Sequence, residues 1–412
     1  MIRARSVGAT KDNSIRTDIA PEARPVPLRV ALLVANYGNY HLARARALTH
    51  IGDIEPSFIE LAAGVKRSPW WTGEREFDRR IIRLSDSSYE EAPMRQLSRQ
   101  VLAVLSQLEP AVVVIAGYSD PPMRSAARWA RRNSRGVVLM GETTEWDLRR
   151  HWWKEFLKRA WIRRYVDAAV VGGQPHRSYI VKLGIDPKRV WDRYDVVDNE
   201  YFSSHADALR AAGSKARIEA GLPEDYFLFV GRFAPEKGLQ TLLRAYRRYR
   251  QQDVRPWSLV LVGDGPLRAA LMKVEREEGI EGVVWAGPKL GEELPRFYGF
   301  AGCFILPSIL EPWGLVVNEA MASGLPVIVS NRCGSAADLV VPGVNGFVFD
   351  AADVDQLGAL MSQMAAKSRE QRHAMGMASR KIIASWSPER WAAQVACAVR
   401  VAARWAPAGR NS

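Results

Sequence analysis

Short apolar runs alternate with amphipathic segments along most of the chain. In the first half, apolar runs of strand length lie at residues 28–34, 111–116, 136–140 and 168–171, and helical periodicity appears at residues 41–48, 94–108 and 122–132. Nearly continuous apolar strands that alternate with helices are typical of a parallel sheet covered on both faces. The first half of the chain therefore predicts an α/β domain.

The second half repeats this plan. Predicted strands lie at residues 226–230, 258–262, 283–286, 303–306, 326–329 and 346–349, and predicted helices at residues 239–249, 266–278, 312–323 and 354–366. At 412 residues the chain also exceeds what one hydrophobic core usually organises. We therefore expect two Rossmann-like α/β domains in tandem.

The domain boundaries follow from changes in composition. Residues 1–26 are polar and predict a disordered tail, residues 27–200 a first Rossmann-like domain, and residues 201–385 a second one. The last segment, residues 386–412, predicts a helix that packs back on the first domain.

Composition narrows the class of protein. With 47% hydrophobic and 25% charged residues, the chain has the composition of an ordinary globular protein. Cys303, Cys333 and Cys397 lie far apart, which argues against a disulfide framework or a cysteine metal site. The start lacks the apolar core of a secretory signal, and the apolar runs are much shorter than the ~18–20 residues that span a bilayer. We expect a cytoplasmic protein that does not cross a membrane.

The charge of the chain points to an anionic partner. The net charge is +13, and most of the excess lies in the first 200 residues. Such an imbalance suits a nucleic acid, a lipid headgroup surface or a phosphorylated acceptor, and charge alone does not choose among them.

The first candidate site is a glycine turn in the second half. The strand that ends at Val230 delivers Gly231, and Arg232 and Lys237 follow on the loop before a helix. Two cations at a strand end suit a diphosphate, because arginine can chelate it and lysine can neutralise it. Taken alone, the same two residues are better explained as solvated surface cations.

Two further glycine turns follow. Gly263 lies between a predicted strand and a helix, which by itself indicates only a tight turn. The third turn presents Glu311 on a loop, and a helix then begins near Gly314 and carries Glu319. The free amides and positive dipole end of that helix can bind phosphate oxygens, and the two carboxylates can accept hydrogen bonds from sugar hydroxyls.

These segments together resemble the retaining glycosyltransferases of family 4, also called group 1 glycosyltransferases. The likeness rests on residues 231–238 and on two glutamates separated by seven residues, Glu311 and Glu319, and it covers most of residues 226–350. It implies a GT-B architecture, in which two Rossmann-like domains with parallel sheets face each other across a cleft. The first domain would then bind the acceptor and the second the nucleotide sugar.

The resemblance also implies roles for single residues. Arg232 and Lys237 would hold the diphosphate, Glu319 the ribose and Glu311 the donor sugar. The full expected set has Glu311, Arg232, Lys237 and Glu142 in catalysis, and Gly38, Gly231, Gly263, Gly314, Leu315, Val316 and Glu319 in substrate binding. Fixed cations and a helix start can stabilise the charge on a departing diphosphate without a metal, so we expect neither a metal nor another cofactor.

The first domain carries weaker signals. Of the glycine-rich turn that relatives have after the first strand, Gly38 alone is present here. Many relatives supply a histidine after the strand that ends at Met140, where this chain has Glu142 and Glu145. Those two glutamates are our candidates for assisting the reaction, and His151 is a weaker one.

A basic, aromatic stretch adds a candidate surface. Residues 152–164 predict an amphipathic helix in which tryptophan, phenylalanine and leucine recur at helical spacing among lysines and arginines. Such a helix can lie on an anionic membrane. The alternative is that its aromatic side chains pack on the sheet of the first domain.

The sequence therefore favours a glycosyltransferase. We expect it to move a hexose-type sugar from a nucleoside diphosphate to a hydroxyl of a glycan or lipid-linked acceptor, with retention and without metal. The enzyme would be peripheral at the inner face of the membrane. A nucleotide-sugar epimerase of the same architecture is the main alternative. A nucleic-acid-binding protein is a weaker one, because the cations lack interleaved RNA-binding signatures.

Overall fold

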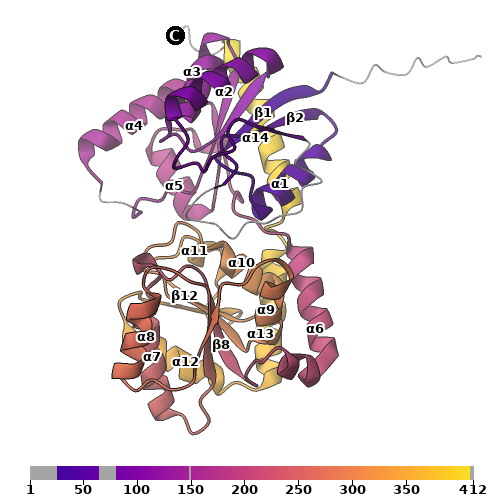
Figure 1. The fold of residues 1–412 in the computed structure, drawn as a ribbon. Coiled ribbons are helices and arrows are strands. Elements are labelled where there is room, and N and C mark those ends of the chain that lie inside the picture. The colour runs from indigo at the N-terminus through magenta and orange to yellow at the C-terminus, as the bar shows by residue number, and fades with distance from the viewer. Residues whose placement is uncertain (1–25, 65–79, 148–149, 409–412) are drawn as a thin grey trace, which may run out of the picture.

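The computed structural model describes residues 26–64, 80–147 and 150–408, which build two α/β domains stacked one above the other (Figure 1). Within these residues the first sheet has seven parallel strands in the order β3-β2-β1-β4-β5-β6-β7. Its strands are β1 Leu28–Val34, β2 Ile54–Glu60, β3 Ile81–Arg83, β4 Val112–Ala116, β5 Gly136–Gly141, β6 Ala168–Val171 and β7 Val190–Trp191.

The second sheet has six parallel strands among the described residues, in the order β10-β9-β8-β11-β12-β13. Its strands are β8 Tyr226–Val230, β9 Ser258–Val262, β10 Val283–Gly287, β11 Cys303–Leu306, β12 Val327–Ser330 and β13 Gly346–Phe349. This order places the ends of β9, β8 and β11 beside one another. The three glycine turns found in the sequence follow these three strands.

Helices cover both faces of each sheet. The helices of the first half are α1 Asn39–Thr49, α2 Met94–Leu108, α3 Pro121–Arg132, α4 Trp152–Tyr165 and α5 Gln174–Lys182. Those of the second half are α6 Asn199–Glu219, α7 Leu239–Gln252, α8 Arg268–Glu277, α9 Leu294–Phe300, α10 Leu315–Ala322, α11 Ala336–Leu339, α12 Val354–Ala365, α13 Arg369–Ile383 and α14 Pro388–Ala408. Figure 1 shows α10 and α11 on the side of the second domain that faces the first.

The core of the first domain follows from the pleat of its strands. Along β1, Val30 and Leu32 belong to one buried cluster, and Ala31 and Leu33 belong to another. Because successive side chains of a strand point to opposite faces, a strand buried on both sides reads as a continuous apolar run. This explains why β1 and β4 are recognisable in the sequence.

Strand β2 is the clearest element that the apolar pattern does not predict. Glu55, Pro56 and Ser57 interrupt its hydrophobic run, and it ends at the fully buried Glu60. The Glu60 carboxylate accepts hydrogen bonds from the backbone N–H of Tyr37 (2.8 Å) and from Asn36 Nδ2 (3.0 Å), and it pairs with Arg83. A buried carboxylate with these partners holds the loop between β1 and α1 in place.

The chain passes between the two domains twice. Helix α6 begins directly after the first crossing and packs against α9 and α10 of the second domain. After α13 the chain returns, and α14 packs against α1, β5 and β6 of the first domain. Asn199 Nδ2 donates to the carbonyl oxygens of Ile383 and Trp386, both at 3.1 Å, so one side chain ties the two crossings together.

Candidate functional site

The three glycine turns of the second domain are packed directly against one another. A Cβ atom on Gly263 would lie 1.9 Å from the carbonyl oxygen of Gly231, and one on Gly238 would lie 2.1 Å from that of Pro307. Both glycines also have positive φ, at +138° and +64°. No other residue fits without moving the backbone. Backbone packing therefore brings the loops after β8, β9 and β11 together.

Lys237 and Glu311, predicted from separate motifs, meet at this edge. The ammonium group of Lys237 forms an ion pair with the carboxylate of Glu311, and both side chains are largely buried. Ser308 Oγ donates a second hydrogen bond to Glu311 Oε2 at 3.1 Å. Arg232 is half-buried on the same loop as Lys237. The structure thus brings Lys237 and Glu311 together where β8 and β11 end, with Arg232 on the adjoining loop.

Helix α10 begins beside this ion pair. Gly314, in the left-handed conformation at φ +93°, is its N-cap, and Leu315 and Val316 form its first turn. Amide groups of a first turn have no partner inside the helix, and they lie at the positive end of its dipole. The residues predicted to touch phosphate therefore border the same edge as Lys237.

Glu319 lies on α10 and is buried, with 1% of its surface exposed. Tyr298 Oη donates to its Oε2 at 2.6 Å, and the hydroxyl of Tyr40 donates to its Oε1. Burial raises the pKa of Glu319 to about 7, although the two tyrosine hydrogen bonds lower it. Tyr40 comes from α1 of the first domain, so this contact crosses between the domains.

His176 forms a second contact across the domains. Its Nδ1 accepts a hydrogen bond from the backbone N–H of Gly173 at 3.1 Å, and its Nε2 lies 2.9 Å from the carbonyl oxygen of Pro312. An Nδ1 that accepts requires the proton on Nε2, which then donates to Pro312. Burial lowers the pKa of His176, which favours this neutral form. The start of α5 is thereby held against the loop that carries Glu311.

Of the first-domain candidates, Glu142 lies among the groups that contact the second domain. It follows β5, and its charge raises the pKa of His176 and, after the larger effect of burial, that of the fully buried Asp195. The backbone oxygen of Asp195 accepts a hydrogen bond from Asn318 Nδ2 of α10 at 2.9 Å. Glu142 therefore lies near two residues that touch the donor-side loop and helix.

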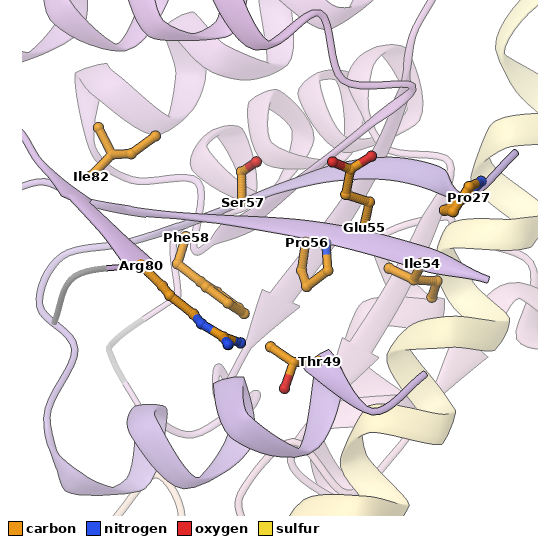
Figure 2. A pocket seen from close by; sticks show the side chains of 9 residues that line it. All are labelled: Pro27, Thr49, Ile54, Glu55, Pro56, Ser57, Phe58, Arg80 and Ile82. Carbon is orange, nitrogen blue, oxygen red and sulfur yellow. The ribbon is translucent and has the colours of Figure 1, made fainter. Parts of the chain in front are cut away.

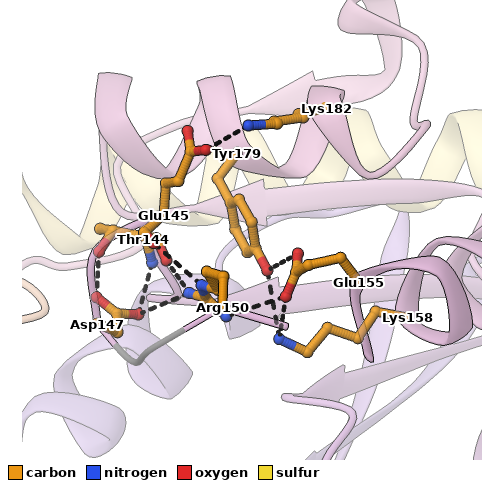
Figure 3. A network of polar contacts seen from close by, with 8 residues as sticks. All are labelled: Thr144, Glu145, Asp147, Arg150, Glu155, Lys158, Tyr179 and Lys182. Carbon is orange, nitrogen blue, oxygen red and sulfur yellow. Dashed lines mark hydrogen bonds and ion pairs between the residues drawn. The ribbon is translucent and has the colours of Figure 1, made fainter. Parts of the chain in front are cut away.

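Glu145 and His151 are placed elsewhere. The carboxylate of Glu145 is exposed and pairs with Lys182, in a network that also contains Asp147 and Arg150 (Figure 3). His151 is exposed and precedes α4. Neither side chain has a recorded contact with the second domain among the described residues.

Gly38 is the N-cap of α1, with an ordinary extended backbone at φ −71°. Its carbonyl oxygen accepts the first hydrogen bond of the helix, from the N–H of Leu42 at 3.0 Å. The conformation does not require glycine at this position. Gly38 directly precedes the first turn of α1, which carries Tyr40 to Glu319.

Helix α4 exposes the large apolar side chains of its first half. The exposed fractions are 84% for Trp152, 48% for Trp153, 67% for Phe156 and 57% for Leu157. The alternative that the aromatic side chains of this helix pack on the first domain is therefore wrong for these four residues, but it holds for Trp161, which packs against the buried core of the first domain. The opposite side of the helix holds the buried Ile162 and is fixed by Glu155, which pairs with Lys158 and accepts a hydrogen bond from Tyr179 (Figure 3).

A groove of about 490 Å³ lies at another place, on the edge of the first sheet formed by β2 and β3 (Figure 2). It is lined by Pro27, Thr49, Ile54, Glu55, Pro56, Ser57, Phe58, Arg80 and Ile82. Several of these residues belong to the amino-terminal ends of β1 and β2, whereas Glu142 and the loops of the candidate site follow carboxyl ends. The groove contains none of the candidate residues.

The sequence patterns do not indicate the contacts of Tyr40, Tyr298 and His176. The position of Tyr40 in the sequence gives one indication, because the first turn of a helix that follows a parallel strand lies at the carboxyl edge of the sheet, where ligands bind. Tyr298 and His176 act through contacts with distant segments, and the local sequence around them carries no pattern that marks such contacts.

Comparisons with known proteins agree with this architecture. Residues 214–382 match the family model described as glycosyl transferases group 1. Over 383 residues the chain is 26% identical to sulfoquinovosyl transferase SQD2 of Arabidopsis thaliana, in an alignment that covers 88% of this chain and 71% of that protein. Over 176 residues it is 32% identical to a GDP-mannose-dependent alpha-(1-6)-phosphatidylinositol monomannoside mannosyltransferase of Mycobacterium tuberculosis, covering 40% of this chain and 45% of that protein.

The solved structure of HepE from Anabaena, in complex with UDP and glucose, has the same fold. It superposes with a TM-score of 0.67 at 16% identity, and the match covers 90% of this chain and 99% of that one. Among the described residues, no helix has the length and hydrophobicity needed to cross a membrane. From the family match, the named relatives and the two parallel-sheet domains, we conclude that residues 214–382 belong to the group 1 glycosyltransferase family and that the chain has the GT-B fold.

Proposed function

We propose that this glycosyltransferase moves a hexose-type sugar from a nucleoside diphosphate to a hydroxyl of a glycan or lipid-linked acceptor, with retention and without a metal or other cofactor. The observation that carries the proposal is the ion pair of Lys237 and Glu311 beside the start of α10. The name of the mycobacterial relative, which includes GDP-mannose and a phosphatidylinositol mannoside, supports this class of donor and acceptor.

In this proposal the second domain binds the donor. Arg232 and Lys237 bind the diphosphate, and the amides of Leu315 and Val316 bind its oxygen atoms. The glycine turns let the backbone approach the phosphates. When the sugar leaves, negative charge develops on the diphosphate, and fixed cations together with a helix start stabilise that charge.

The ion pair gives Lys237 and Glu311 linked roles. A diphosphate offers the Lys237 ammonium group a second anion, which releases one oxygen of Glu311 to accept a hydrogen bond from a sugar hydroxyl. Glu319 accepts hydrogen bonds from the ribose. Glu142 is the first-domain group that we propose contacts the donor sugar or the acceptor.

We propose front-face displacement for the transfer step. The bond between the anomeric carbon and the phosphate oxygen breaks, and its electron pair stays on the diphosphate. The acceptor oxygen forms its bond to the anomeric carbon on the same face, and its proton passes to the departing phosphate. Retention in this scheme rests on the resemblance to family 4, and NMR of the product linkage tests it: an inverted anomeric centre would refute the scheme.

Donor panels test the function itself. Thermal unfolding with UDP, GDP and ADP and their hexose derivatives should reveal one base that raises the melting temperature, because a ligand that binds the folded state stabilises it. That donor should then release nucleoside diphosphate only when an acceptor is added. Altered free sugar without an acceptor would instead indicate an epimerase, and no stabilisation by any nucleotide would contradict the proposal.

We further propose that the protein is cytoplasmic and works at the inner face of the membrane, through the exposed side of α4. Trp152, Trp153, Phe156 and Leu157 are exposed there, next to Lys154, Arg159 and Arg163. The one acidic residue of α4, Glu155, faces the body of the protein, where it is paired. Aromatic rings favour the headgroup region, and cations near the surface add about 1 kcal/mol each on anionic lipid.

Vesicle co-sedimentation tests this surface with matched variants. The wild-type protein should sediment with phosphatidylglycerol vesicles at low salt and much less with phosphatidylcholine vesicles. Changing Trp152 and Phe156 to serine, or Arg159 and Arg163 to glutamate, should lower recovery about tenfold or more. Ile218→Ser, at an exposed apolar position on α6, is the control. Equal recovery on both lipids would contradict the proposal.

A further inference from the structure

The carboxylate of Glu319 is occupied from two sides by tyrosine hydroxyl groups. Tyr298 lies on α9 of the same domain as Glu319, and its Oη donates to Oε2 at 2.6 Å. Tyr40 lies in the first turn of α1 in the other domain, and its hydroxyl donates to Oε1. Each carboxylate oxygen therefore already accepts a hydrogen bond from a hydroxyl group.

The two tyrosines differ in their freedom to leave. Tyr298 is fully buried, and its ring packs edge-on against Phe202 at 5.9 Å between centroids and near Phe304 at 6.1 Å. Tyr40 is half-buried and meets Glu319 across the boundary between the domains. Because Glu319 itself is almost fully buried, a ligand that reaches its carboxylate must first displace a covering side chain. Of the two covering side chains, Tyr40 is the less buried one and comes from the other domain.

We infer that Tyr40 is a gate of the donor site, whose hydroxyl group takes the place on Glu319 that a ribose hydroxyl takes when the nucleotide binds. The inference depends on the proposed function, because it assumes that Glu319 binds the ribose. The exchange replaces one O–H donor on the carboxylate with another. The affinity for the nucleotide is therefore lower than it would be with a free Glu319 carboxylate. The reason is that Tyr40 still covers Glu319 in part of the protein molecules.

The other contacts between the domains do not depend on Tyr40. His176 still donates to the carbonyl oxygen of Pro312, and Asn318 still donates to that of Asp195, both at 2.9 Å. Asn199 keeps the two chain crossings together. Opening the gate therefore requires a movement of the Tyr40 side chain and the start of α1, rather than separation of the two domains.

Calorimetric titration with a nucleoside diphosphate tests the gate. UDP, GDP and ADP are titrated into the full-length protein, and the one that binds is used for the variants. Tyr40→Phe removes the competing hydroxyl and leaves the ring, so we expect its dissociation constant to fall about tenfold, the size of one hydrogen bond to a charged group. Tyr298→Phe, which removes the hydroxyl on the buried side, should not tighten binding.

A 2′,3′-dideoxy nucleoside diphosphate of the same base sharpens the test. Without ribose hydroxyls the ligand has no donor for Glu319, so Tyr40→Phe should leave its affinity unchanged. Tyr40→Leu is a second variant that also lacks the hydroxyl and should behave like Tyr40→Phe.

The outcomes separate the gate from the function. Tight binding to the wild-type protein with equal or weaker binding to both Tyr40 variants would overturn the gate alone. Tightening of the same size with the dideoxy ligand would also overturn it, because the effect would not involve the ribose. If none of the three nucleotides bound any form of the protein, the proposed function would fail as well.

Discussion

The two domains position their functional groups in different ways. In the second domain, backbone packing does so: a Cβ atom on Gly263 or Gly238 would overlap a neighbouring carbonyl oxygen, and the same turns bring Lys237 to Glu311. In the first domain, side chains from separate elements reach across singly, as Tyr40 and His176 do. Close backbone packing requires glycine and leaves a motif in the sequence. Isolated side-chain contacts leave none.

The largest expected effect tests the second-domain side of this comparison. Lys237→Ala should lower turnover by about two to three orders of magnitude, because removing one fixed donor from the charge that develops in the transition state typically costs that much. Initial rates with the donor identified by thermal unfolding measure this effect. Lys215→Ala, which removes an exposed lysine paired with Glu219 on α6, is the control and should be near wild type.

A rate for Lys237→Ala within threefold of the wild type would remove the assignment of Lys237 to the diphosphate. Circular dichroism of the variant separates this outcome from misfolding, which would also lower the rate.

A second prediction concerns Glu319, where the two sides meet. Its pKa is about 7 in the folded protein, raised by burial, against an ordinary 4.5. Between these values the folded protein retains a proton that the unfolded chain has released. The free energy of unfolding should therefore fall as the pH rises from 4.5 to about 7, by on the order of 3 kcal/mol from this group, and level off above that pH.

Glu319→Gln should lack this contribution, because the amide does not titrate. Denaturant unfolding at a series of pH values measures the difference between the two curves. Parallel curves for wild type and variant across this range would show that Glu319 is not buried as described.

A smaller loss of turnover is expected for changes in the first domain, where each functional group acts through one side-chain contact. Glu142→Gln should lower turnover about tenfold, the scale of one hydrogen bond to a charged group. Glu145→Gln should stay within twofold, because Glu145 is exposed and pairs with Lys182 away from the second domain. Turnover rates of the two variants under saturating donor show which of the two glutamates assists the reaction. A larger loss of rate for Glu145→Gln than for Glu142→Gln would contradict our choice of Glu142.

The sequence predicts most of the fold because buried parallel strands are continuous apolar runs. Strand β2 escapes this rule, since Pro56 and charged residues interrupt it and its register comes from pairing with β1. Helix periodicity alone also does not tell whether an apolar side is buried. On α14, Trp391 is buried against the first domain, whereas on α4 Trp152 is exposed. That difference depends on tertiary packing, which the pattern does not contain.

The candidate site, like the fold, was predictable only where local sequence determines the structure. The segments around Lys237, Glu311 and Glu319 could be found because their spacing is set by strands, turns and one helix. The sequence does not reveal the pairing of Lys237 with Glu311, nor the tyrosine of α1 that covers Glu319. Both contacts depend on side chains that meet only in the folded chain.

The most direct test of the account is a crystal structure of the protein with its nucleoside diphosphate bound. We expect diphosphate oxygens within hydrogen-bond distance of Arg232, Lys237 and the first amides of α10, with the ribose on Glu319 and Tyr40 displaced from it. A nucleotide bound elsewhere, such as in the groove beside β2 and β3, with the Lys237–Glu311 and Tyr40–Glu319 contacts intact, would contradict it.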